Sequence, residues 1–394
     1  MTSNDKTLLF LNIGHTWDHL AMLIFPTVVL AMTGEFGLDY AGLLQLSIGG
    51  FIAFGAGSLP AGWLGDHWDR RGMMILFFLG LGTATIATGF AQGPIQIAVA
   101  LTFVGLCASI YHPVGLAMLV RGQQARVGQV LGVNGVWGNL GVAFAALSAG
   151  GLAEWFGWRW AFIVPGVLCV LTGLAFIYFV PAVTLGAPAG KKAQVTYSPG
   201  VMKRVFISLV AVTICGGIIF NATTIAMPKL FEERLSVMVH TTFGVGALVC
   251  CVFVLAAVAQ LCVGRLIDGR PLRSVFLPFA AVQVPLILIG MFAEGWGMLA
   301  AAFAMMFVVF GLIPINDAIV ARYVADAWRS RIYAVRYVMS FTGSSLAVPM
   351  IGGLHRADGG FAGVFAVLGV LAVGSLAAAL LFPAPRNEVA AQPA

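Results

Sequence analysis

Residues 62–71 read GWLGDHWDRR, and residues 264–273 read GRLIDGRPLR. Each stretch follows a long apolar run and places a glycine four residues before an aspartate, with arginines close behind. Asp268 lies 202 residues after Asp66, and the two glycines keep the same offset. Two equivalent loops at one fixed offset indicate a chain built from two related halves.

The composition outside these loops is strongly apolar. Of the 394 residues, 60% are apolar and 9% are charged, whereas soluble domains carry roughly 25% charged residues. The mean hydropathy is +0.98. So few charges cannot cover a water-soluble surface, and the basic residues lie in short loops rather than in one tract. The chain is predicted to be an integral membrane protein with the lipid bilayer as its partner and no nucleic acid.

A helix that crosses a bilayer needs about 20 apolar residues. Charged, glycine and proline residues divide the chain into twelve such runs, at 7–32, 40–64, 73–92, 94–120, 128–152, 159–181, 205–228, 241–263, 275–293, 297–320, 334–355 and 360–382. We therefore predict an all-α membrane protein with twelve transmembrane helices in two pseudo-symmetric six-helix bundles.

The domain division and the orientation follow from the loops. The polar stretch 183–204 is rich in Pro, Gly, Ala and Lys, which is typical of a flexible linker. It separates a first bundle, 1–182, from a second bundle, 205–394. Alternate loops carry sixteen Lys and Arg residues on one side and four on the other. The positive-inside rule then places both termini and the linker in the cytoplasm, in a plasma membrane of the bacterial inner-membrane type. We interpret the N-terminal apolar run as a retained helix rather than a signal peptide.

The loop at 62–71 is similar to the Gly-x-x-x-Asp-Arg-x-Gly-Arg-Arg pattern of the major facilitator superfamily of secondary transporters, although His67 and Asp69 replace an arginine and a glycine. This resemblance implies that the loop holds the cytoplasmic ends of the two bundles together in one state. The residues to which we assign a gate role are Asp66, Arg70, Arg71, Asp268, Arg270, Asp317 and Arg336.

A narrower resemblance lies in the first and fourth spans. The patterns Asn-x-x-His-x-x-Asp-His at 12–19 and Ser-Ile-Tyr-His-Pro at 109–113 are similar to the fosmidomycin-resistance branch of the superfamily. That branch exports drugs in exchange for protons, so the resemblance implies a drug–proton antiporter.

Ionisable groups deep in the membrane are costly, at about 2.5–3.5 kcal/mol each, and are functional candidates for that reason. His15, Asp18 and His19 share one helix face, since their spacing is i, i+3, i+4. A rise of 1.5 Å per residue puts Asp18 at a depth of about 16 Å and His112 at about 12 Å. We predict that these four residues form the proton-coupling site. A structural hydrogen-bond network, or a metal site that includes Met22, would use the same side chains.

The remaining polar and aromatic positions suggest a substrate pocket. No Lys or Arg reaches mid-membrane on the first, fourth, seventh or tenth span, so a weakly polar or amphipathic substrate fits better than a multiply charged anion. The predicted substrate-binding residues are Asn12, Tyr111, Phe220, Asn221, Thr224, Phe310 and Asn316.

These features together predict a proton-coupled secondary transporter that exports small organic compounds or drugs by alternating access. The alternative is a transporter of a metal ion or metal chelate that uses the His, Asp and Met side chains. No P-loop is present to bind ATP. A membrane enzyme has only Ser109 near His112 in its favour, so we predict no enzyme, no cofactor, no resident metal and a monomer.

Overall fold

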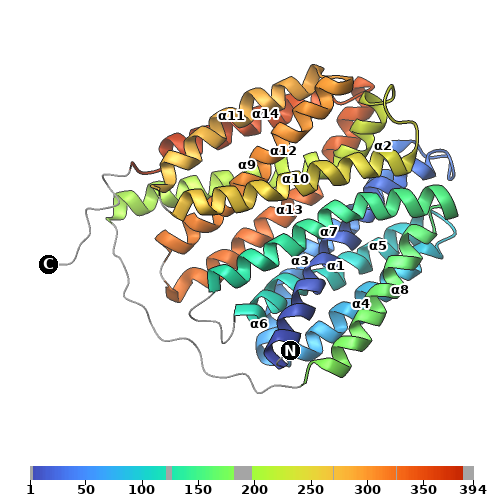
Figure 1. Ribbon diagram of the computed structural model, residues 1–394, viewed down its shortest axis with the longest axis horizontal. Helices are drawn as coiled ribbons and strands as arrows, with labels where there is room; N and C mark the ends of the chain where they lie inside the picture. Colours follow the sequence, from blue (N-terminus) through green and yellow to red (C-terminus); the bar gives the residue numbers. More distant parts are fainter. Residues whose placement is uncertain (1–2, 121–126, 182–197, 269, 325, 385–394) are drawn as a thin grey trace.

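The computed structural model describes residues 3–120, 127–181, 198–268, 270–324 and 326–384. Within these ranges the chain is almost entirely helical and contains no strand (Figure 1). Eleven helices of the described part are long and apolar enough to cross a membrane. The predicted all-α membrane fold is confirmed. Most of the predicted linker, residues 183–197, lies outside the described residues.

The first half contains the elements up to residue 179. They are α1 (Ser3–Met32), α2 (Tyr40–Gln45), α3 (Ile48–His67), α4 (Arg70–Gly89), α5 (Pro94–Ala108), the π-helical turn η1 (Tyr111–Gly115), α6 (Leu116–Val120), α7 (Val127–Phe156) and α8 (Trp160–Phe179). The fourth predicted span, 94–120, is therefore not one helix. Pro113 has no N–H to donate to the helix, and the chain widens into η1 around it.

The second half begins at residue 199. Its elements are α9 (Pro199–Arg234), α10 (Thr242–Asp268), α11 (Leu272–Phe292), α12 (Gly295–Tyr323), α13 (Asp326–Asp358) and α14 (Ala362–Leu381). Helix α9 starts six residues before the predicted span because Ser198 accepts a hydrogen bond from Val201 N–H and Pro199 occupies the first helical position. Helix α13 runs past both ends of its predicted span and is not among the eleven apolar helices of the described part.

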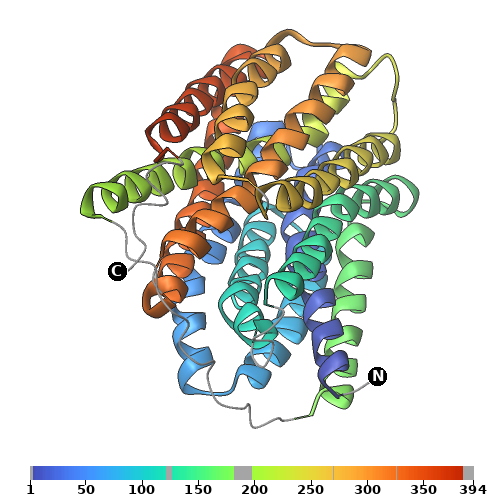
Figure 2. The ribbon, with the colours of Figure 1, turned by 60° about the vertical axis from the view of Figure 1, so that its left-hand side comes forward.

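The helices pack in pairs within each half, parallel in the pairs α1–α7, α3–α5 and α9–α13 and antiparallel in α4–α8 and α11–α14. Helix α1 lies along α7, α3 along α5 and α4 along α8, while α11 packs against α14 and α9 against α13. The halves meet mainly where α7 lies beside α10 and where α13 crosses α3, and both ribbon views show α7 and α10 side by side (Figures 1 and 2).

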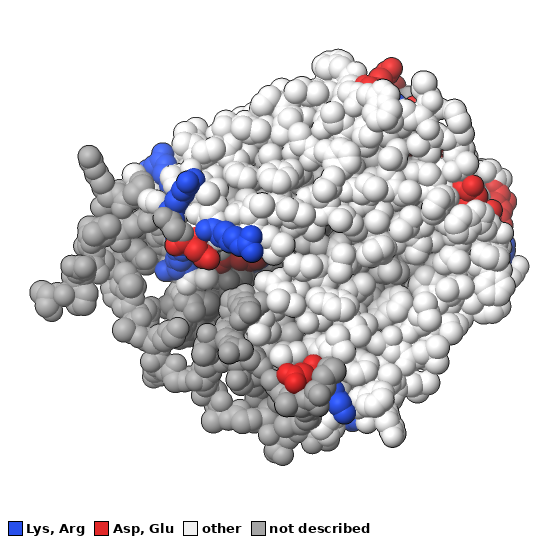
Figure 3. Space-filling model, viewed as in Figure 1, with Lys and Arg blue, Asp and Glu red and all other residues white. Residues whose placement is uncertain are grey.

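The ends of the helices form two opposite faces of the molecule. The predicted cytoplasmic face contains the start of α1 and the turn between α3 and α4, and the predicted extracellular face contains α2. In the space-filling view, the visible charged side chains lie toward these ends and a broad uncharged surface lies between them (Figure 3). Such a band fits the hydrocarbon core of a bilayer.

The 202-residue repeat is visible in hydrogen bonds. Arg71 donates from Nε to the carbonyl oxygen of Val180 at 2.7 Å. Arg273 donates from Nη1 to the carbonyl oxygen of Phe382 at 2.8 Å. Both the donors and the acceptors are 202 residues apart. Each arginine satisfies a carbonyl just past the last helix of its own half, where helix C-termini leave acceptors without partners.

Candidate functional site

A carboxylate and an imidazole meet in the interior of the first half. Asp18 of α1 is 0% exposed, and its Oδ2 lies 3.2 Å from Nε2 of His112 in η1. Among the described residues neither carboxylate oxygen of Asp18 accepts a hydrogen bond, so the His112 contact is an ion-pair distance without hydrogen-bond geometry. A carboxylate in such an apolar setting is costly unless it is protonated or paired with a cation. The pair can therefore hold one shared proton at low cost and exchange it when water gains access.

Two further imidazoles adjoin this pair. His19 Nε2 lies 3.2 Å from His15 Nε2, and the His15 and His112 rings meet edge to face at 5.3 Å between centroids. His15 Nδ1 donates to the carbonyl oxygen of Asn134 in α7 at 2.8 Å. Because that bond requires the proton on Nδ1, the Nε2 of a neutral His15 is an acceptor, and His19 Nε2 is its donor.

Helix α7 fixes this cluster through Asn134, which is 1% exposed. Its side-chain amide donates to Asn12 Oδ1 at 2.9 Å and to the Tyr111 hydroxyl at 2.8 Å. The Tyr111 hydroxyl donates in turn to the carbonyl oxygen of Leu11, and the Tyr111 ring stacks on His15 at 4.9 Å. Sequence analysis missed Asn134. The sequence did offer a signal that could have identified it, because Asn134 is an amide side chain within an apolar span and close to three small residues.

The three histidines can also offer metal ligands. One ring nitrogen from each of His15, His19 and His112 lies within 4.8 Å of those of the other two. In a tetrahedral site with metal–nitrogen bonds of about 2.0–2.1 Å, two ligand nitrogens are about 3.3 Å apart. The His15–His19 separation already has this value, whereas the widest separation would have to contract.

The predicted substrate residues have different surroundings. Asn12 and Tyr111 belong to the Asn134 network just described, and Tyr111 is fully buried. In the second half, the Phe220 and Phe310 rings lie 5.4 Å apart. Asn221 and Thr224 donate to backbone carbonyls of α9. Asn316 keeps its side-chain oxygen without a donor among the described residues.

The predicted gate residues form two ion pairs in the described part of the chain, each within one half. Arg70 pairs with Asp66 at 2.6 Å, and Arg336 pairs with Asp317. Asp268 ends α10 and is exposed, as is Arg270. Their gate role stays a prediction.

Contacts between the halves lie from mid-membrane to the predicted extracellular face. Asn139 of α7 donates to Gln260 of α10 at 2.8 Å, and Glu154 accepts from Phe243 N–H. At the far end Arg356 of α13 donates to both carboxylate oxygens of Asp39. These hydrogen bonds join the two halves on the side of the predicted extracellular face.

The Asp39–Arg356 pair lies outside the membrane spans, and its electrostatics follow from its geometry. Hydrogen bonds from Arg356 and from Gly42 N–H lower the pKa of Asp39 to about 2. The carboxylate is therefore charged at all physiological pH values. Neither Asp39 nor Arg356 was singled out from the sequence, because they are 317 residues apart and each looks like an ordinary loop charge.

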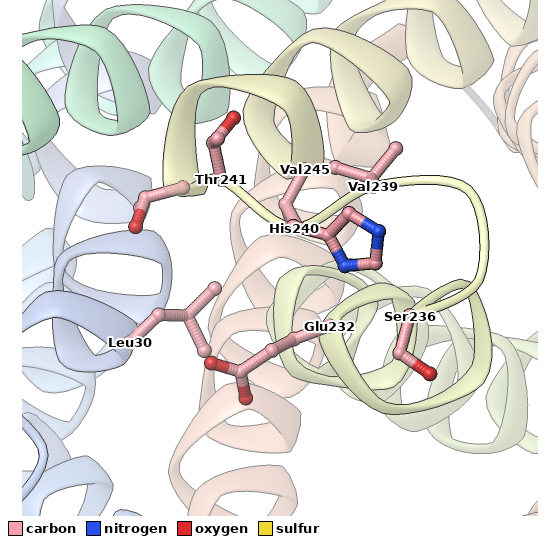
Figure 4. A pocket seen from close by; sticks show the side chains of 8 residues that line it. Leu30, Glu232, Ser236, Val239, His240, Thr241 and Val245 are labelled. Atoms are coloured by element: carbon pink, nitrogen blue, oxygen red, sulfur yellow. The ribbon is translucent and has the colours of Figure 1, made fainter.

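A cavity of about 250 Å³ lies between the two halves (Figure 4). It is formed by the end of α1, the end of α9 and the start of α10, with Leu30, Glu232 and His240 among its lining residues. None of the predicted site residues lines it. The buried Asp18–His112 pair is thus a separate site.

Comparison with known proteins now identifies the family. Residues 20–255 match the sequence profile of the Major Facilitator Superfamily. The chain belongs to this superfamily. Its membership and its fold indicate a multi-pass membrane transporter rather than an enzyme.

Individual relatives are distant. A puromycin resistance protein of Streptomyces alboniger is 31% identical over 126 residues, which is 31% of this chain and 25% of that protein. The chain spans only 25% to 37% of the length of five such curated relatives. A Na⁺, Li⁺, K⁺/H⁺ antiporter of Planococcus maritimus is 23% identical over 392 residues, 89% of each chain.

A solved structure confirms the fold over the whole chain. A bacterial homologue of the human lysosomal transporter Spinster, in an inward-facing and occupied conformation, superposes with a TM-score of 0.77 at 14% identity, over 97% of this chain and 96% of that one.

Proposed function

We propose that this superfamily member is a proton-coupled secondary transporter that exports small organic compounds by alternating access. The observation that carries the proposal is the fully buried Asp18 carboxylate, with His112 Nε2 at 3.2 Å and two more imidazoles beside it. A buried carboxylate in a membrane span marks a proton or ion pathway by default.

The coupling step is a proton exchange at this pair. When Asp18 loses its proton in a water-accessible state, the charged carboxylate must be stabilised by a protonated imidazole or by water. Closing the site removes the water and favours the state in which the proton is shared. A difference of one pKa unit between the two facing states would supply about 1.4 kcal/mol of coupling.

The proposed substrate class and transport direction are inferred from the pocket candidates and from the names of two relatives. The pocket candidates on α9 and α12 are aromatic or neutral polar groups, Phe220 and Phe310 among them, which suit an amphipathic molecule. One relative is named a puromycin resistance protein and another an antiporter of cations and H⁺. Exchange of a substrate for protons is the activity that the antiporter's name states, and the buried pair supplies a group that can hold the proton for such an exchange.

The test compares Asp18→Asn with wild type in proteoliposomes. Puromycin and a library of small organic compounds are first scored by thermal shift at pH 6 and pH 8, and the strongest binder is then radiolabelled. Asp18→Asn should abolish accumulation driven by a pH gradient and preserve gradient-independent exchange. Glu35→Gln, a surface carboxylate paired with Arg159, is the matched control and should retain both. Gradient-driven accumulation by Asp18→Asn at the wild-type rate would exclude Asp18 as the coupling residue.

The second candidate function is transport of a transition-metal ion, and the cluster of three histidine nitrogens within 4.8 Å favours it. Imidazole suits Zn²⁺, Ni²⁺ and Cu²⁺. Zn²⁺ or Ni²⁺ should then raise the melting temperature of purified wild type, and His19→Ala should remove this effect while His240→Ala leaves it. If the two variants respond like wild type, the cluster binds no metal.

A further inference from the structure

The π-helical turn η1 touches the buried pair on one side and helix α3 on the other. His112 meets Asp18 of α1 at 3.2 Å, and its ring also lies 6.0 Å from that of Phe54 in α3. The next two residues, Pro113 and Val114, face the predicted cytoplasmic end of α3. One short turn therefore joins the Asp18 site to the helix that leads into the Asp66–Arg71 loop.

The contact between η1 and α3 is close because glycines line it. A Cβ added to Gly62 would lie 3.2 Å from Pro113 Cβ, and one added to Gly65 would lie 2.7 Å from Val114 Cγ2. Gly65 directly precedes Asp66, and Val114 is only 1% exposed. With no flexible side chain between the two backbones, a displacement of η1 is passed to α3 rather than absorbed.

The turn is also the place where this span can change shape. Pro113 provides no N–H for the carbonyl oxygen four residues earlier, so the wide turn lacks a bond that would hold it rigid. π-Helical turns inside α-helices occur frequently at functional sites. On the side facing α1, Gly115 lets the Tyr111 ring lie close to the backbone, since an added Cβ would be 2.9 Å from Tyr111 Cε2.

We infer that Val114, with Pro113, is a positioning residue that couples the packing of the Asp18–His112 contact to the conformation of the Asp66–Arg71 loop. This inference rests on the proposed function for its biological meaning, but the physical link can be measured without transport. A change of side chain at Asp18 displaces His112, η1 moves with it, and the end of α3 follows.

The test is hydrogen–deuterium exchange of residues 62–71 in the full-length protein, with Asp18→Asn as the perturbation of the contact with His112. In an otherwise wild-type chain, Asp18→Asn should change the exchange rate of these amides about fivefold or more, the lower range of allosteric couplings. In a Val114→Ala background the change should fall below about twofold.

Val104→Ala is the matched control. Val104 is 2% exposed and lies in α5, the helix that leads into η1, so its truncation removes the same atoms without touching α3 near Gly65. The Asp18→Asn response should remain intact there. An equal response in the Val114→Ala and Val104→Ala backgrounds, or no response in wild type, would overturn the inference.

Melting temperatures confirm that each variant is folded. If Val114→Ala does not fold, Gly65→Ala alters the same contact from the α3 side and should give the same loss of response. Proteoliposome transport separates the two proposals. If Asp18→Asn loses gradient-driven transport without a change in the exchange of residues 62–71, the inferred link through η1 is wrong and the proposed function stands. If the exchange changes and gradient-driven transport is kept, the proposed function is wrong and the link stands.

Discussion

Replacing Gly138 by alanine should disrupt the imidazole cluster from the α7 side. A Cβ at this position would lie 2.5 Å from Cε1, 2.7 Å from Nε2 and 2.8 Å from Nδ1 of His15. Ordinary contacts begin near 3.4 Å, so the ring must move by about 1 Å, or α1 and α7 must separate by a similar amount. The His15 Nδ1 bond to Asn134, at 2.8 Å, cannot survive such a shift unchanged.

The cost has two parts. Overpacking a close helix contact costs about 1–3 kcal/mol, and a lost buried hydrogen bond adds about 1–3 kcal/mol. We expect Gly138→Ala to lower the free energy of unfolding by about 2–6 kcal/mol and to impair gradient-driven transport. Gly132 is the control on the same helix, since a Cβ there would meet nothing within 4 Å, and Gly132→Ala should be neutral or slightly stabilising.

A double-mutant cycle with His15→Ala decides whether the clash is the cause. Equilibrium unfolding in mixed micelles is measured for wild type, both single variants and the double variant. If Gly138→Ala acts by displacing the His15 ring, it should cost little in the His15→Ala background, with a coupling energy of about 1–3 kcal/mol. Additive losses would refute this reasoning and would place the effect in the α7 backbone instead.

Three further outcomes are expected. Asp66→Asn should shift the population toward inward-open states, read as a longer distance between spin labels on the cytoplasmic ends of the second and eleventh spans. Closure of the predicted extracellular face should not depend on pH between 5 and 8. The pKa of Asp39 is lowered to about 2, so the stabilisation from its carboxylate is complete above about pH 4 and is lost only as the pH falls toward 2. Asp39→Asn should open that face equally across pH 5 to 8 in a thiol-accessibility assay. Asn139→Leu, which leaves the Gln260 amide without its partner across the halves, should cost about 1 kcal/mol in unfolding experiments.

Much of the fold could be predicted from the sequence because a membrane span has a simple physical requirement. Twenty apolar residues between polar loops predict a helix regardless of tertiary context. The two Gly-x-x-x-Asp loops predicted the internal repeat, which is also visible in the equivalent hydrogen bonds of Arg71 and Arg273. Helix ends were less predictable, since α9 extends from Pro199 to Arg234, past both ends of its apolar core. Hydropathy marks the part in the bilayer and says little about helical turns outside it.

The buried cluster was predictable for a related reason. Ionisable residues are rare in spans, so His15, Asp18 and His112 stood out, and helix periodicity put His15 and Asp18 on one face. Asn134 stood out less because a neutral amide costs less to bury, and its bond to His15 uses its backbone carbonyl, which every residue has. A proline within a span indicates a lost helical hydrogen bond but not the shape that follows: the chain widens at Pro113, whereas α12 continues through Pro314.

The two halves share a framework but not this chemistry. The positions 202 residues after Asp18 and His112 are Phe220 and Pro314, and α12 continues through Pro314 without a wide turn. Asp18 and His112 both belong to the first half, so a rigid rocking motion of one half against the other does not itself separate them. Any displacement of His112 then has its origin at Asp18, as inferred above. Inter-half pairs such as Asp39 with Arg356 span the two halves and must break when the halves rock apart. Under the proposed function, the buried pair would hold the proton while the breakable contacts at the faces decide from which side the proton arrives.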